Sequence, residues 1–175
     1  MAEYLQGIVV ASRGIPVTLI ISLVAVTGGM IIGLFVAIAK RSKYKILRAI
    51  ATVYVDILRG TPLLVQVLIL AYGVPQLLKS AFDLQFNWEH MIIVGFIACG
   101  INSSAYMAEI IRSGLQAIDK GQTEAARSLG LSSGQTMRYI IVPQAFKIIV
   151  PALGNEFVTL IKETSILSVA GIVEI

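Results

Sequence analysis

The stretch KGQTEAARSLGLSSGQ, Lys120 to Gln135, is polar and rich in small residues, yet long apolar segments flank it on both sides. Of the 175 residues in the chain, 57% are hydrophobic and 14% are charged. Soluble globular proteins are about 45–50% apolar and about 25% charged, so this composition indicates a membrane protein. The polar stretch is therefore an insert between membrane segments, and the segments around it define the fold.

Four apolar segments are long enough to cross a bilayer, whose hydrocarbon core needs about 20 helical residues. The expected spans are Ile15 to Ala39, a broken segment from Ile50 to Leu78, Met91 to Ile111, and Pro143 to Ile161. Gly60 and Pro62 should break the second segment near its entry into the membrane, and Leu63 to Leu78 then finishes that crossing. The sequence predicts an all-α, polytopic transmembrane bundle, forming one domain over residues 1–175.

Two further features of the spans concern their number and their packing. After Ile161 the remaining apolar residues are too few to cross a membrane as a helix. In the first span small residues recur every four positions, at Ala25, Gly29, Gly33 and Ala37. This stripe suits close helix packing, and glycines that are merely tolerated in lipid are the alternative.

Lysine and arginine are distributed unevenly among the connections between spans. Residues 40–59 carry six and residues 112–147 carry five, against three elsewhere, at Arg13, Lys79 and Lys162. By the positive-inside rule, eleven against three places the Lys120 insert in the cytoplasm and the N-terminus outside. Because these charges flank apolar segments rather than forming one basic domain, we expect no nucleic-acid binding.

The insert, about residues 113–138, is predicted to contain a short helix from Gln122 to Leu129. Gly130 fits the left-handed position after that helix, and Ser132 or Ser133 can cap the next one. A helix lying on lipid would carry larger hydrophobic residues and a polybasic face, and this helix has neither. Ala125 and Ala126 instead offer a low-relief surface to another protein, and an exposed cytoplasmic connector is the alternative.

The insert belongs to a longer pattern of residues. Its order is Glu124-Ala125-Ala126, three residues, Gly130, nine residues, Ile140, one residue and Val142-Pro143. This pattern resembles the cytoplasmic-loop signature of membrane subunits of binding-protein-dependent ATP-binding-cassette (ABC) importers. Valine stands at position 142, where leucine is usual. Three further segments resemble the polar-amino-acid branch of that family: RGTPLLVQ (59–66), AEIIRSGLQAIDKGQ (108–122) and GNEFVTLIKETS (154–165).

The resemblance implies a permease with a type I ABC importer fold, in which the insert is a coupling helix that contacts a separate ATPase subunit. It also implies a further span after the KETS region, so we expect a fifth span to be missing and the domain to be incomplete at its C-terminus. The contact and capping positions would be Glu124, Ala125, Ala126 and Gly130. ATP and magnesium would bind to the ATPase, since this sequence has no Gly-x-x-x-x-Gly-Lys phosphate loop. We expect this chain itself to have no catalytic residue, cofactor or metal site.

The resemblance also implies where the permease works and with what. It places the chain in the cell (inner) membrane as a multi-pass protein within the lipid bilayer. The expected partners are the ATPase, a second permease subunit that is identical or related, an extracytoplasmic substrate-binding protein and an amino-acid substrate. Because four or five helices are too few to enclose a solute route, a dimer of permease subunits is expected.

Polar residues inside the spans indicate the substrate path, because they are costly in hydrocarbon and usually face a water cavity. The candidates are Asn102 in the third span and Asn155, Glu156, Thr159 and Glu163 in the fourth. Pro151 and Gly154 are expected to open the helix just before these residues. Glu109 lies three residues before Arg112, so a local ion pair is its expected role.

The charge balance of the spans bears on the substrate. No basic residue occurs in their central parts, so a cationic amino acid is a candidate partner of Glu156, and protonation of its carboxylate is an alternative. A hydrogen bond to a neutral amide side chain, or a structural bond to Asn102, would serve equally. An ATP-independent channel or ion-coupled carrier subunit is the alternative function, with Glu109 and Glu156 as ion sites, and a structural membrane anchor is the third. Neither explains the spaced residues of the insert.

Overall fold

The computed structural model describes the backbone of residues 2–171, and its side chains at residue 12 and from residue 14 onward. In that part of the chain all regular structure is helical, as predicted. The elements, with π-helical turns η1 and η2 and a 3-10 helix η3, are α1 (Ala2–Lys40), α2 (Lys45–Gly60), α3 (Leu63–Leu68), η1 (Ile69–Gly73), α4 (Val74–Phe82), α5 (Met91–Gln116), α6 (Lys120–Ser128), α7 (Ser133–Thr136), η2 (Met137–Ile141), α8 (Val142–Glu163) and η3 (Thr164–Ala170).

Four helical stretches in the described residues are long and apolar enough to cross a membrane: Gly14–Lys40, Leu63–Phe82, Met91–Gln116 and Ser133–Ala170. The predicted number of spans is therefore confirmed. The predicted start of the fourth span at Pro143 is wrong, because η2 joins α7 to α8 without a break. Within a regular helix the Pro143 ring would meet the carbonyl of Tyr139, and the wider π turn that contains Tyr139 accommodates it.

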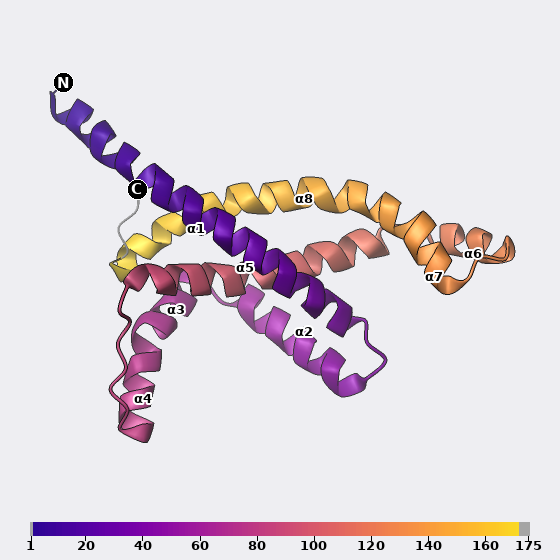
Figure 1. Ribbon diagram of the computed structural model, residues 1–175, viewed down its shortest axis with the longest axis horizontal. Coiled ribbons are helices and arrows are strands. Elements are labelled where there is room, and N and C mark those ends of the chain that lie inside the picture. Colours follow the sequence, from indigo (N-terminus) through magenta and orange to yellow (C-terminus); the bar gives the residue numbers. More distant parts are fainter. Residues whose placement is uncertain (1, 172–175) are drawn as a thin grey trace.

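The break predicted in the second segment is confirmed and is sharper than expected. Helix α2 ends at Gly60, Thr61 and Pro62 are extended, and a new helix begins at Leu63. Proline disfavours the helical conformation of the residue before it, so Thr61 leaves the helix. In Figure 1, α3 and α4 run downward from this break, away from the bundle of α1, α5 and α8.

Helices α1 and α5 cross at the centre of the molecule along the small-residue stripe (Figure 1). A Cβ at Gly29 would lie 2.9 Å from the Ser103 Cβ, and a Cβ at Gly33 would lie 2.7 Å from the Met107 Cβ. Ala25 and Ala37 are buried in the same stripe. The stripe is therefore a packing seam, and tolerance of glycine in lipid does not explain it.

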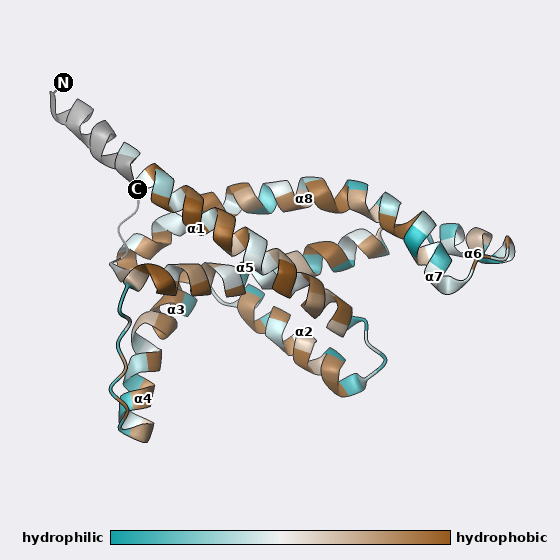
Figure 2. Ribbon diagram, viewed as in Figure 1, coloured by the Kyte–Doolittle hydropathy of each residue, from teal (hydrophilic) through white to brown (hydrophobic). Residues whose placement is uncertain are grey.

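In Figure 2 brown, hydrophobic residues predominate along the described part of α1 and occur along much of α8, whereas teal, hydrophilic residues gather around α7. Along α1, the exposed fractions of Ile31, Phe35 and Ile38 are 62%, 67% and 60%. Exposed apolar surface of this extent suits lipid or a second membrane subunit. Helix α8 runs continuously through Pro151 and Gly154, so the expectation that they open this helix is wrong.

Candidate functional site

A cavity of about 280 Å³ lies at the break between α2 and α3. It is lined by three parts of the chain that are distant in sequence: the α2 to α3 break, the middle of α5 and the end of α8. The residues lining it are Arg59, Gly60, Thr61, Pro62, Leu63, Asn102, Tyr106 and Glu163. Broken helices at the membrane midplane are typical binding sites in transporters, because their ends present unpaired backbone groups to a ligand.

The geometry of the break is held by the side chain of Gln66. Its Nε2 donates to the Leu58 carbonyl at 2.9 Å, to the Thr61 carbonyl at 3.2 Å and to the Thr61 Oγ1 at 2.9 Å. Its Oε1 accepts a hydrogen bond from Asn102 Nδ2 at 3.2 Å. One glutamine thus ties the end of α2 to the middle of α5 and fixes Asn102 at the cavity wall. The structural hydrogen bond of Asn102 is therefore made to Gln66 and not to Glu156, the partner considered from the sequence.

The cavity brings opposite charges together. The Arg59 guanidinium carbon lies 5.2 Å from the centroid of the Tyr106 ring, a cation–π distance that fixes the arginine on the cavity wall. Glu163 reaches the same cavity from the end of α8. A small ligand that carries both an anionic and a cationic group would find a partner for each within one cavity.

Two of the five residues predicted for the substrate path, Asn102 and Glu163, line this cavity. The other three, Asn155, Glu156 and Thr159, lie on α8 but do not line it, and Thr159 Oγ1 donates to the Asn155 carbonyl at 3.0 Å. Glu156 is close enough for the charges of Glu163 and Arg59 to act on it. Arg59, which the sequence analysis counted among the connections, is therefore a basic residue near Glu156.

Glu109 forms the ion pair expected with Arg112 and a second one across helices. Its carboxylate accepts hydrogen bonds from Arg112 Nε at 3.0 Å and from Lys40 Nζ at 3.3 Å. Lys40 ends α1, so the pair ties the ends of α1 and α5 together beside the insert. Because Glu109 is paired with both Lys40 and Arg112, a structural role accounts for its carboxylate.

Sequence reasoning missed the cavity residues Arg59, Thr61 and Tyr106 as site residues. It counted Arg59 among the charged connections, in residues 40–59, and it assigned no role to Thr61 or Tyr106. The available signal was the RGTP break itself, because a helix interrupted by glycine and proline within an apolar segment often marks a binding site. Which helix faces this break could not be read from the sequence.

The insert folds as predicted in its main features. Helix α6 is capped at its start by Asp119, whose Oδ1 accepts from the Gly121 amide at 2.7 Å, and Gly130 follows it with φ +83°. Ser132 begins α7 with a capping box, in which its Oγ accepts from the Gln135 amide at 3.3 Å. In Figure 1, α6 lies at the extreme tip of the molecule, beyond the ends of α5 and α8.

The two alanines of α6 differ in exposure, which corrects the expectation that both offer a contact surface. Ala126 is 4% exposed and faces the chain itself, and its carbonyl accepts from the Leu131 amide at 3.1 Å. Glu124 and Ala125 are exposed, and Leu129 is 82% exposed. The outward surface of α6 therefore consists of an acid, a small residue and one large apolar residue.

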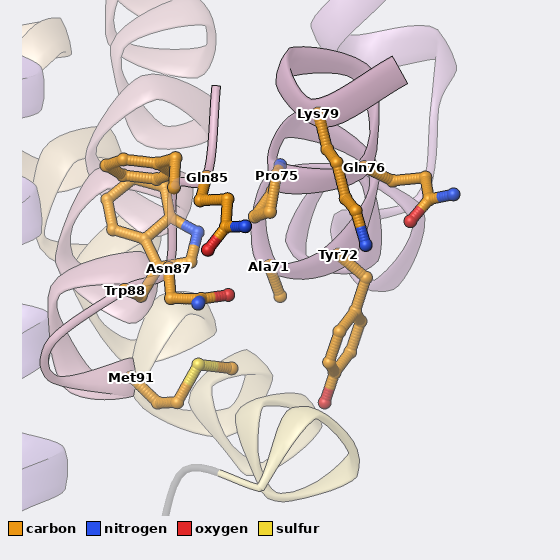
Figure 3. A pocket seen from close by; sticks show the side chains of 10 residues that line it. Ala71, Tyr72, Pro75, Gln76, Lys79, Gln85, Asn87, Trp88 and Met91 are labelled. Carbon is orange, nitrogen blue, oxygen red and sulfur yellow. The ribbon is translucent and has the colours of Figure 1, made fainter. Parts of the chain in front are cut away.

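A second cavity, of about 530 Å³, lies at the opposite end of the molecule from α6. Figure 3 shows it between α4 and the linker to α5, with Gln85 and Asn87 pointing toward α4 and Lys79 reaching down beside Tyr72. Trp88 fixes the linker by donating its Nε1–H to the Leu70 carbonyl at 2.9 Å. Tyr72 donates its hydroxyl to the Ala170 carbonyl at 3.2 Å, which joins this end to η3.

Comparison with known proteins gives a consistent result. Residues 29–173 match the family described as binding-protein-dependent transport system inner membrane component. The chain is 43% identical to the arginine transport system permease protein ArtQ of Bacillus subtilis, covering 91% of this chain and 70% of that protein. It is 40% identical to the putative glutamine transport system permease protein GlnP of Rickettsia prowazekii, covering 98% of this chain and 75% of the relative.

Solved structures agree with these relatives. A crystal structure of an amino acid ABC transporter with histidines matches with a TM-score of 0.89 and 44% identity, covering 99% of this chain and 77% of that one. The inward-facing MetNI methionine ABC transporter matches with a TM-score of 0.63 at 21% identity, which supports the fold alone. The chain therefore belongs to the inner-membrane components of binding-protein-dependent transport systems, as a multi-pass permease subunit of the amino-acid ABC importer branch.

Proposed function

We propose that this permease carries a polar amino acid through the cavity at the α2 to α3 break. The supporting observation is that Arg59, Asn102 and Glu163, which are distant in sequence, all line one cavity of about 280 Å³. That volume is near the lower end of ligand pockets, about 300 Å³, and suits a metabolite of amino-acid size. An amino acid carries a carboxylate and an ammonium group, and the cavity offers a partner for each.

The roles of the lining residues follow from their chemistry. Arg59 binds the α-carboxylate, since a guanidinium presents paired donors to a carboxylate. Glu163 accepts from a cationic group, and Asn102, Tyr106 and Thr61 provide uncharged hydrogen-bonding groups. Two acidic residues of α8, Glu156 and Glu163, lie near one basic residue, Arg59, and this composition favours a basic amino acid. Relatives named for arginine and for glutamine are both compatible with a polar substrate.

We further propose that α6 is the coupling helix that contacts a separate ATPase subunit, in which ATP and magnesium bind. Support comes from its tip position, its defined caps and its exposed Glu124, Ala125 and Leu129. In this proposal α6 lies in the cytoplasm and the N-terminus lies outside. A second permease subunit would complete the path, and an extracytoplasmic binding protein would deliver the amino acid for transport by alternating access.

The test is ATP hydrolysis by the complex purified from its native membrane and reconstituted with its binding protein, with arginine or glutamine as the amino acid. Glu163→Gln should lower arginine-stimulated hydrolysis about tenfold or more, because a hydrogen bond to a charged group contributes about 1.5–3 kcal/mol. Glu156→Gln should have a smaller effect, confined to arginine. Glu89→Gln, in the exposed linker, is the control and should leave hydrolysis unchanged.

Three results would count against parts of this proposal. Full arginine stimulation in Glu163→Gln would remove Glu163 from the substrate site. Stimulation of the unaltered complex by glutamine alone would keep the importer and discard the preference for a basic substrate. A preparation that contains no ATPase and passes amino acids down their gradient would favour the channel or carrier subunit.

A further inference from the structure

Helix α2 has three distinct faces, and two of them are explained by packing and apolar character. Ala51 and Val55 are 5% and 1% exposed and face the bundle. A second face, which we name the apolar row, consists of Ile46, Ile50, Val53 and Ile57, with exposed fractions of 77%, 62%, 55% and 57%. Their spacing of i, i+4, i+7 and i+11 places them in one line along the helix.

The third face is charged, although the helix lies among membrane helices. Arg48, Thr52, Asp56 and Arg59, which we name the polar row, follow at i, i+4, i+8 and i+11 and form a parallel line about a third of a turn from the apolar row. Arg48, Asp56 and Arg59 are exposed and Thr52 is half-buried. Charged side chains therefore extend along the whole length of α2.

The depth of α2 in the membrane follows from its contacts with α5. The Tyr54 hydroxyl lies 2.6 Å from Ser104 Oγ and 3.4 Å from the Ile101 carbonyl. Ser104 lies near the middle of α5, a membrane-crossing helix of 26 residues. Val55 packs in one cluster with Ala105 and Ala108 of the same helix. The part of α2 around residue 55 is therefore at the middle depth of the bundle.

An unpaired charge at that depth is not stable against lipid. The ion pairs found among the described residues join Glu109 to Lys40 and to Arg112, so Asp56 belongs to neither. Charged residues within membrane bundles face water or a protein interior, and the exposed Asp56 has no such interior around it in this chain. Water in the assembled transporter would satisfy Asp56, and the last member of the row, Arg59, already lines the cavity at the break.

We propose that the polar row lines a water-filled passage that connects this cavity with the basic loop before α2, and that the transported amino acid leaves along it. The passage deepens the transport function proposed above and rests on it for the identity of the cargo. The row offers alternating groups for a zwitterion: the guanidinium groups of Arg48 and Arg59 for its carboxylate and Asp56 for its ammonium group. Water in the passage keeps each contact weak enough for release.

The test uses cysteine reactivity in the assembled transporter, in inside-out membrane vesicles. The chain's single cysteine, Cys99, is buried and is first replaced by alanine. Thr52→Cys and Asp56→Cys probe the polar row, and their immediate neighbours Val53→Cys and Ile57→Cys are matched controls on the apolar row at the same depth. The probe is a membrane-impermeant, positively charged methanethiosulfonate reagent, which reacts with the thiolate form of cysteine.

Thr52→Cys and Asp56→Cys should react about tenfold or more faster than Val53→Cys and Ile57→Cys, because a thiol ionises readily in water and poorly in apolar surroundings. Equal rates at all four positions, or faster reaction on the apolar row, would overturn the passage. Monodispersity in detergent shows that each variant is folded. Similar labelling rates for Thr52→Cys and Asp56→Cys show that the result does not depend on removing the Asp56 charge. The labelling rates are independent of hydrolysis, so the passage and the substrate assignment can fail separately.

Discussion

At the scale of single residues, Gly130 and Gln66 show two different reasons why a residue type is required. Gly130 has open space around its missing Cβ, so its requirement comes from the backbone, whose φ of +83° is costly for other residues. Gln66 is required for its amide, which satisfies three acceptors at the α2 to α3 break and holds Asn102. The first defines the end of α6, and the second defines the cavity.

Gly130→Ala should lower the free energy of unfolding by about 1–2 kcal/mol, because alanine is strained in the left-handed region. Gly134→Ala is the matched control: Gly134 lies in α7, also with open space around it, and alanine there should be neutral or slightly stabilising. Thermal unfolding of the two variants in detergent measures the difference. Equal midpoints would show that the turn after α6 does not depend on glycine.

At the scale of elements, α1 and α5 form one unit, because their backbones approach at Gly29 and Gly33. The Glu109 ion pairs then tie the ends of the same two helices. Helix α2 joins this unit through Tyr54, whereas α3 and α4 leave it at the break. The break between α2 and α3 therefore lies beside a packed pair of helices, next to the cavity.

Gly33→Ala should destabilise the protein by about 1–3 kcal/mol, since its Cβ would lie 2.7 Å from both the Met107 Cβ and the Ser104 carbonyl oxygen. The Ser104 backbone cannot move away from the added methyl group as the end of a flexible side chain could. Gly28→Ala, on the same helix with nothing within 4 Å, should be neutral or stabilising. Unfolding midpoints in detergent decide the matter, and equal loss in both variants would contradict the seam.

At the scale of the whole molecule, the α2 to α3 break and helix α6 lie far apart. The C-terminal part of α5 and the N-terminal part of α8 run between them (Figure 1). The backbone hydrogen bonds of a helix are satisfied internally, so a displacement at one end is passed along its length. Gln144 of α8 also donates to Gln122 of α6 at 3.3 Å. A force applied at α6 by a partner would therefore reach α8 and, through it, Glu163.

Leu129→Asn should weaken association with the ATPase by at least about 1 kcal/mol, roughly fivefold in affinity, because a large exposed apolar side chain is the usual anchor of an interface. The unfolding midpoint of the permease should stay unchanged, since Leu129 is 82% exposed. Leu84→Asn removes another exposed leucine at the opposite end and should leave association intact. Binding of the purified ATPase to each variant measures both, and unchanged binding for Leu129→Asn would remove it from the interface.

Much of the fold could be predicted because its signals are local. Apolar length indicated the spans, Gly60 and Pro62 indicated the break, and Gly130 and Ser132 indicated the turns around α6. The candidate site was predicted only in part. Asn102 and Glu163 were selected by their polarity within apolar helices, while Arg59 was misassigned because its charge resembled that of a cytoplasmic loop.

By itself, the sequence determined the helical class, the number of spans and the position of the insert, since periodicity, length and capping act between residues near in the chain. Only the tertiary structure decided which residues share the cavity, that Ala126 faces inward, and that α2 carries a charged face at the depth of the α5 midpoint. These depend on the relative positions of helices, which are set by packing contacts such as those at Gly29 and Gly33 between residues about 70 positions apart.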